Sequence, residues 1–259
     1  MWETGRWSYE EFSKFGTVTS LLSGQTFLQL PSFSDWLNIK CIDVFKFEEE
    51  KFTNAVTEEN AILAAKDYQN LVFGDLPLTI PKSGVNSFKN GKAYSVIDKA
   101  SNYSYWREVA NNSPAFKKSS DNLGYVVLPS DFSSTFAQSA ASVRCYSALK
   151  GAKNPTAAPC FALFESRSFN LTKLDDKMPK KITEYLTTSF NTNGFIPNYN
   201  FTINETGYSI YKMFDEYGMS IRDGGRGEAA MKSAAPRINQ LIETSSGVKL
   251  PTIDQDKKK

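Results

Sequence analysis

The chain has 259 residues, a length that suits one large domain or two smaller ones. Its 30 lysine and arginine residues nearly balance its 28 aspartate and glutamate residues, so the net charge of +2 gives no electrostatic argument for binding nucleic acid or an anionic membrane. The hydrophobic content of 41% is sufficient for an ordinary globular core, and no apolar run approaches the roughly 20 residues of a membrane span.

Histidine is absent from the sequence, which excludes Ser-His and Cys-His nucleophile systems and removes the commonest zinc ligand. The three cysteines, Cys41, Cys145 and Cys160, contain no Cys-x-x-Cys pair. We therefore predict no metal site, no cofactor and no disulfide framework. We expect buried thiols, because free cysteine behaves as a small hydrophobe, and a Cys145–Cys160 bridge would require an oxidising compartment.

The chain begins with a predicted helix and a predicted strand. Ser8 and Glu11 have the spacing of a capping box, which predicts a helix over residues 8–22 that stops near Gly24. The following apolar residues 26–30 are strand-like and end before a proline.

Further predicted elements continue the alternation of strands and helices. Residues 44–56 alternate apolar and polar side chains around a charged turn, as in a hairpin, and residues 57–73 have apolar side chains at helical spacing. An Asn-Gly turn precedes a short strand over 93–98, and a helix is predicted over 102–111. The compact apolar segment 124–128 is predicted to be a strand.

The second half of the chain is predicted to be mainly helical, with helices over 155–165, 178–190, 213–217 and 231–242 and a loop over 193–202. Because strands and helices alternate along the chain, the predicted class is α/β. Aromatic residues make up 14% of the sequence, a surplus that a stacking-type binding cleft would use.

Five segments, in this order, resemble the extracellular solute-binding proteins of sugar-type ABC importers, the maltodextrin-binding-like family. They are "GRWSYEEF", "FKFEEEKFTNAVTEENAILAAKDYQNLV", "FKNGKAYSVID", "LGYVVLPSD" and "ALKGAKNPTAAPCFALFE". The resemblance covers residues 5–165, whereas the last 90 residues fit only loosely. Tyr94 and Ser95 depart from the family pattern, which has a small residue and a methionine there.

The resemblance implies a periplasmic-binding-protein-like fold of two α/β lobes that close around a ligand by hinge motion. Residues 1–135 would form the main part of the second lobe, residues 136–200 a partial first-lobe segment, and residues 201–259 the return to the second lobe and a tail. The family's first third, with its signal peptide and lipobox cysteine, has no counterpart here. The first lobe is therefore expected to be incomplete, and Met1 is expected not to be the natural start.

The resemblance also indicates where a sugar would bind. Aromatic rings stack on the C–H faces of sugars, and carboxylates and amides pair with the hydroxyl groups. The expected ligand-binding residues lie in two loops after strands, the place where α/β sheets usually bind ligands. They are Phe33, Asp35 and Trp36 after the first strand, and Asn102, Tyr103 and Trp106 after the strand that follows Gly91. Trp36 is flanked by Leu37 and Ile39, so buried packing is the alternative there. Asp35 and Asp98 are the expected acceptors for hydroxyl groups.

The expected function is therefore that of the solute-binding component of an importer, with no catalysis. Its partners would be a small carbohydrate and a membrane permease, and the intact protein would be a cell-surface lipoprotein or periplasmic. A truncated lobe that acts as an interaction or structural protein is one alternative. A glycoside-processing enzyme is another, although no motif places the two carboxylates that glycoside hydrolysis needs.

Overall fold

The structure is a computed structural model, and the residues that it describes are 8–40, 42–49, 51–75, 77–79, 86–126, 128–129, 154, 156–157, 160–161, 177–184, 202–203 and 208–246. They form a mixed arrangement of helices with small sheets. In this part of the chain, no helix combines the length and the hydropathy needed to cross a membrane.

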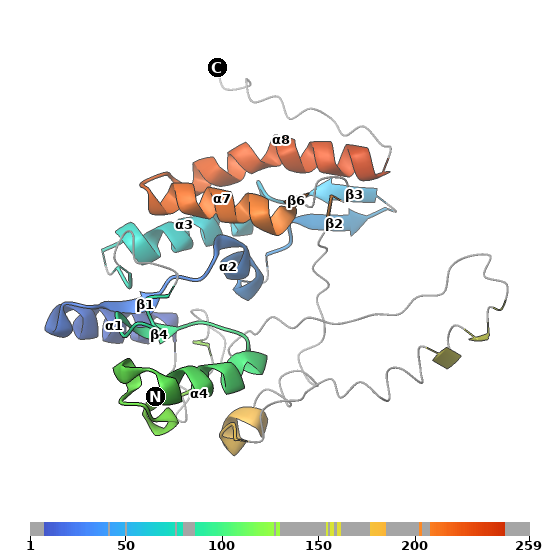
Figure 1. The fold of residues 1–259 in the computed structure, drawn as a ribbon. Coiled ribbons are helices and arrows are strands. Elements are labelled where there is room, and N and C mark those ends of the chain that lie inside the picture. The colour runs from blue at the N-terminus through green and yellow to red at the C-terminus, as the bar shows by residue number, and fades with distance from the viewer. Residues whose placement is uncertain are drawn as a thin grey trace.

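The sheets in the described residues are all two-stranded (Figure 1). β1 (Thr26–Gln29) pairs in parallel with β4 (Ala93–Val96), and Thr26 lies opposite Ala93. β2 (Phe45–Glu48) and β3 (Lys51–Asn54) form an antiparallel hairpin. A third pair joins β5 (Thr202–Ile203) to β6 (Tyr208–Ser209).

The first helix, α1 (Tyr9–Ser23), begins and ends with the predicted signals. The Ser8 hydroxyl accepts a hydrogen bond from the Glu11 backbone N–H at 3.2 Å, which satisfies one of the free amides of the first turn. Gly24 ends the helix in the left-handed conformation, with φ of 67°, which glycine adopts without steric cost. Phe12 then packs edge-on against Phe27 of β1 at 5.3 Å between ring centroids.

The main core lies between helices from opposite ends of the chain. α2 (Phe33–Ile39) and α3 (Glu59–Phe73) are covered by α7 (Ile210–Arg222) and α8 (Gly227–Ser246), which lie side by side above them in Figure 1. Two glycines allow this close approach. A Cβ atom at Gly218 would clash with Phe33, and a Cβ atom at Gly227 would overlap the carbonyl oxygen of Ala65.

Hydrogen bonds from two polar side chains also connect the elements of this core. The Asn54 amide at the end of β3 donates to the Ala235 carbonyl at 2.9 Å and to the Asn239 side chain at 2.7 Å, both on α8. The Tyr68 hydroxyl donates to the Pro31 carbonyl at 2.9 Å, and burial raises the pKa of this phenol. Because these polar groups are paired, the core contains them at little cost.

A smaller layer follows β4. It consists of the short 3₁₀ helix η2 (Ala100–Asn102), α4 (Tyr103–Asn112), and the 3₁₀ helices η3 (Pro114–Phe116) and η4 (Ser120–Asn122). Tyr103 forms a second small core with Met178 and Ile182. The apolar side chains at positions 178 and 182 are therefore covered.

The structure confirms most of the predicted elements in the first 112 residues and corrects several others. Residues 33–39 are helical rather than a loop. Gly124, Tyr125 and Val126 have no strand structure, so the strand predicted over 124–128 is wrong for these residues. The predicted helix over 213–217 extends over 210–222. The predicted helix over 231–242 is part of one 20-residue helix, α8.

Other predictions fall partly or wholly outside the described residues. Most of the predicted helix over 155–165 and of the predicted loop over 193–202 lies outside them, as do Cys41 and Cys145. Cys160 is an exposed free thiol, so the prediction of a buried thiol is wrong there. The α/β class holds in the coarse sense of mixed helices and strands, whereas the division into two lobes stays a prediction.

The contact at Gly227 leads to a stability prediction. Gly227→Ala would force α8 away from Ala65, and overpacking of this kind typically costs about 1–3 kcal/mol. Gly124→Ala is the matched control, because a Cβ atom there meets nothing within 4 Å. Urea unfolding followed by circular dichroism should show a lower midpoint for Gly227→Ala only. Equal midpoints for the two variants would contradict the close packing of α8 on α3.

A second prediction concerns the acid stability of the same contact. Hydrogen bonds from Lys232 and Lys66 lower the pKa of Glu228 from 4.5 to about 2. Between these values the unfolded chain holds a proton that the folded chain lacks, so stability rises with pH in this window. The stabilising contribution is complete above about pH 4.5 and is lost as the pH falls through about 2. Glu228→Gln should therefore lower the urea midpoint slightly at pH 5, because the ion pairs are exposed to solvent, and its midpoint should converge with that of the wild type near pH 2. A constant difference across that range would contradict this assignment.

Candidate functional site

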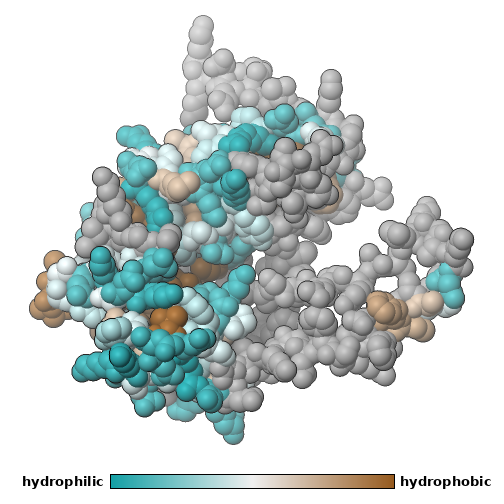
Figure 2. All heavy atoms as spheres, in the orientation of Figure 1, coloured by the Kyte–Doolittle hydropathy of each residue, from teal (hydrophilic) through white to brown (hydrophobic). Residues whose placement is uncertain are grey.

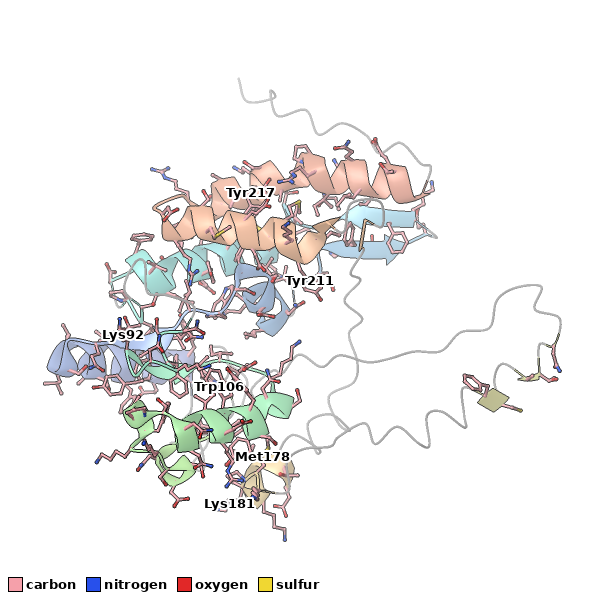
Figure 3. The ribbon with its side chains drawn as sticks, in the orientation of Figure 1. Lys92, Trp106, Met178, Lys181, Tyr211 and Tyr217 are labelled. Carbon is pink, nitrogen blue, oxygen red and sulfur yellow. The ribbon has the colours of Figure 1, made fainter. Side chains whose placement is uncertain are left out.

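The candidate site lies where β4 ends and α4 begins. Asp98 follows β4 after one residue, Asn102 immediately precedes α4, and Trp106 lies in the first turn of α4. Side chains at the carboxyl ends of parallel strands are well placed for ligands in α/β proteins. Figure 3 shows Trp106 on the side of α4 that faces the β1–β4 sheet.

Asp98 organises the polar part of this site. One carboxylate oxygen accepts hydrogen bonds from the Lys99 backbone N–H at 2.7 Å and from the Asn102 side-chain amide at 2.8 Å. The other oxygen accepts from the Trp106 indole N–H at 2.7 Å. A carboxylate has about four lone-pair positions, so roughly one stays available to a ligand. Asp98 is itself exposed, which keeps that position accessible.

Aromatic rings surround Trp106, which is half-buried. The Phe88 ring meets its indole edge-on at 5.2 Å between centroids, and Tyr105 approaches it at 5.1 Å with an angle of 67° between the planes. Phe88 also contacts Phe116 at 5.2 Å. We call Phe88, Tyr105, Trp106 and Phe116 the aromatic patch. Phe88 is buried beneath the patch, whereas Tyr105 is 47% exposed and therefore accessible to a ligand.

Two further bonds hold this patch on the sheet. The Phe88 backbone N–H donates to the side-chain oxygen of Gln29, the last residue of β1, at 3.0 Å. The Ser113 hydroxyl at the end of α4 donates to the Lys89 carbonyl at 3.3 Å. The rings are therefore positioned by the end of β1 and by α4.

Tyr103 has a supporting role in this arrangement. Its ring is buried and meets Tyr125 edge-on at 5.3 Å. Burial raises the pKa of Tyr125, and the nearby Asp98 carboxylate raises it further. Tyr103 thus packs the start of α4 and does not offer a ring face to a ligand, contrary to our expectation from sequence.

The other three predicted residues lie elsewhere and have structural contacts. Phe33 is 1% and Trp36 3% exposed, and both belong to the main core. The Trp36 indole N–H donates to the Ala64 carbonyl at 2.8 Å, and the Phe33 ring lies 4.9 Å from that of Tyr68. The packing alternative for Trp36 therefore holds, and neither ring has a face free for stacking.

Asp35 belongs to the cap of α2. Its carboxylate accepts a hydrogen bond from the Ser32 hydroxyl at 2.9 Å, and its backbone N–H donates to the same hydroxyl at 3.1 Å. Ser32 is thus the N-cap of α2, and the Asp35 carboxylate holds the capping hydroxyl in place. Asp35 is exposed, yet its side chain already stabilises the helix start.

Phe88 and Tyr105 were missing from the residues predicted to bind a ligand. Tyr105 precedes Trp106 in the sequence, so its proximity could have been inferred. Phe88 lies ten residues before Asp98, beyond a turn and a strand, and nothing in the local sequence pattern connects it with Trp106. In the part of the chain that the structure describes, no group of three potential metal-ligating side chains occurs. The site as described offers ring faces, a carboxylate and an amide.

The different environments of two tryptophans can be tested by stability measurements. Trp36→Ala should cost about 3–5 kcal/mol, because it empties a filled core position and leaves the Ala64 carbonyl without its donor. Trp106→Ala should cost clearly less, since its ring is half-buried. Urea unfolding measures both changes. If the two variants are equally destabilised, the assignment of Trp36 to the core and Trp106 to the surface is wrong.

No family model matches the chain, and neither the curated proteins nor the solved structures contain a significant match to it. The resemblance to sugar-binding proteins therefore rests on the sequence motifs alone.

Proposed function

We propose that the chain binds a carbohydrate at the aromatic patch, without catalysis. The observation that carries this proposal is the partly exposed Trp106 ring held by Asp98 beside an exposed tyrosine. Because the indole N–H is already bonded, the orientation of the ring is set and a contact with it costs little further entropy. The resemblance of residues 5–165 to sugar-importer proteins supports the same ligand class.

The polar groups beside the rings suit hydroxyl groups of a sugar. Asp98 retains acceptor capacity, and the side-chain oxygen of Asn102 accepts no hydrogen bond in the described structure. A sugar ring that stacks on Trp106 would place its edge toward these two acceptors. Ring stacking and paired hydroxyl groups are the combination by which proteins recognise carbohydrates in water.

We further propose that this patch is one side of a two-lobe cleft. In that arrangement the second lobe would cover the sugar, and the loaded protein would deliver it to a membrane permease on the extracellular side. A patch open on one side supplies only part of the contact surface. Two stacks and a few partly solvated hydrogen bonds contribute about 1 kcal/mol each, and part of this gain offsets the loss of translational freedom, so we expect a binding free energy no stronger than roughly −4 kcal/mol. This corresponds to a dissociation constant of about 1 mM.

Calorimetric titration with a panel of oligosaccharides tests the proposal. We expect saturable binding near the millimolar range by the wild type and no detectable binding by Trp106→Ala. Tyr211→Ala is the control, because Tyr211 is an exposed aromatic on α7, well separated from Trp106 in Figure 3. Binding that survives in Trp106→Ala would refute the site, and no binding of any saccharide by the wild type would refute the ligand class. Release of reducing ends during the titration would favour the glycoside-processing alternative.

One observation favours the alternative of an interaction module. α1 carries Phe15, Val18, Leu21 and Leu22 on its surface, and the last two are 78% and 85% exposed. In Figure 2 an apolar patch lies at the left edge, where Figure 1 places α1. Exposed apolar side chains that gather in one place commonly mark an interface. If no saccharide binds and sedimentation shows association that Leu22→Gln abolishes, this alternative is the better description.

A further inference from the structure

A concave site lies between α3 and the start of α8, apart from the aromatic patch. It is a surface hollow of about 350 Å³, lined by Lys66, Gln69, Asn70, Arg226 and Glu228. The volume falls within the range of small-molecule sites, and the lining side chains come from segments more than 150 residues apart.

The floor of this hollow is closely packed. The Gly227 backbone N–H donates to the side-chain oxygen of Gln69 at 2.9 Å. Gly227 also lies so close to Ala65 that no Cβ atom would fit there. These contacts hold the start of α8 against α3 at the hollow.

The one carboxylate of the lining is already compensated. Glu228 forms ion pairs with Lys66 at 2.9 Å and with Lys232 at 2.8 Å. Arg226, by contrast, has no hydrogen bond or ion pair from its guanidinium group within the described structure, and the Asn70 side-chain amide is likewise unpaired there. With Lys66, Lys232 and Arg226 against Glu228, the hollow and its immediate rim have an excess of positive charge.

From this arrangement we propose that the hollow binds a small molecule through an oxyanion, a carboxylate or a phosphate group. The Arg226 guanidinium presents parallel N–H groups that match two oxygens of such an anion. The free amide N–H groups of Asn70 and Gln69 supply further donors at the floor. Glu228 holds Lys66 and Lys232 in place through its ion pairs. These lysines offset its negative charge, so that Glu228 does not repel an anion in the hollow.

The test is a titration of the full chain with inorganic phosphate and with citrate, at an ionic strength held constant with sodium chloride, followed by calorimetry. We expect saturable binding of at least one of the two anions. Arg226→Gln should weaken it by at least about tenfold, because charge-assisted hydrogen bonds are roughly twice as strong as neutral ones. Asn70→Asp should abolish it by adding a negative charge to the hollow. The two anions separate a phosphate ligand from a carboxylate ligand.

Arg237→Gln is the matched control. Arg237 lies within α8, is exposed like Arg226, and contacts Glu216 at 3.9 Å and the Tyr217 ring at 5.9 Å, away from the hollow. The Arg237→Gln substitution removes the same positive charge at a position outside the hollow, so anion binding should be unchanged. Saturation by neither anion would overturn the proposal. So would an equal loss in Arg226→Gln and Arg237→Gln, since that result indicates general charge attraction. Circular dichroism confirms that each variant is folded before titration.

Discussion

The backbone contact between α8 and α3 is the constraint on which the main core depends. Gly227 brings the start of α8 against Ala65, and Gly218 does the same for α7 against Phe33. Larger residues at these positions would separate the helices and expose the apolar faces of α2 and α3. The hydrogen bonds from Asn54 to α8 then fix the position of the β2–β3 hairpin relative to these helices. The core is consequently a joint product of the first third and the last fifth of the chain.

The fold was predictable from sequence where local signals decide it. The capping serine and terminal glycine of α1, the alternating hairpin and the apolar spacing of α3 all act within a few residues of one another. α2 was not predicted, because the helix is short and its N-cap, Ser32, directly follows a proline, a pattern that is also typical of a loop. The segment 124–128 has the composition of a strand, yet composition alone does not supply a neighbouring strand to pair with.

The part of the candidate site whose residues are close together in the sequence was also predictable. Asp98, Asn102 and Trp106 lie four residues apart in succession, so a helix start brings them together, whereas Phe88 joins them only through the packing of α4 on the sheet. The residue type alone does not distinguish an exposed aromatic residue from a buried one. Phe33 and Trp36 belong to the core, whereas Tyr105 is exposed. The hollow between α3 and α8 could not be predicted, because residues 66–70 and 226–228 are far apart in the sequence and come together only in the folded chain.

The long separation between the two halves of the core has a consequence during protein synthesis. Residues 33–73 present their apolar side chains well before residues 210–246, which cover them, leave the ribosome. At translation rates of about 5–20 residues per second, this interval lasts on the order of ten seconds. Collapse of a short chain is many orders of magnitude faster, so the nascent N-terminal segment has ample time to form non-native contacts or to bind a chaperone. Completion of the core therefore waits until α8 has been synthesised and released.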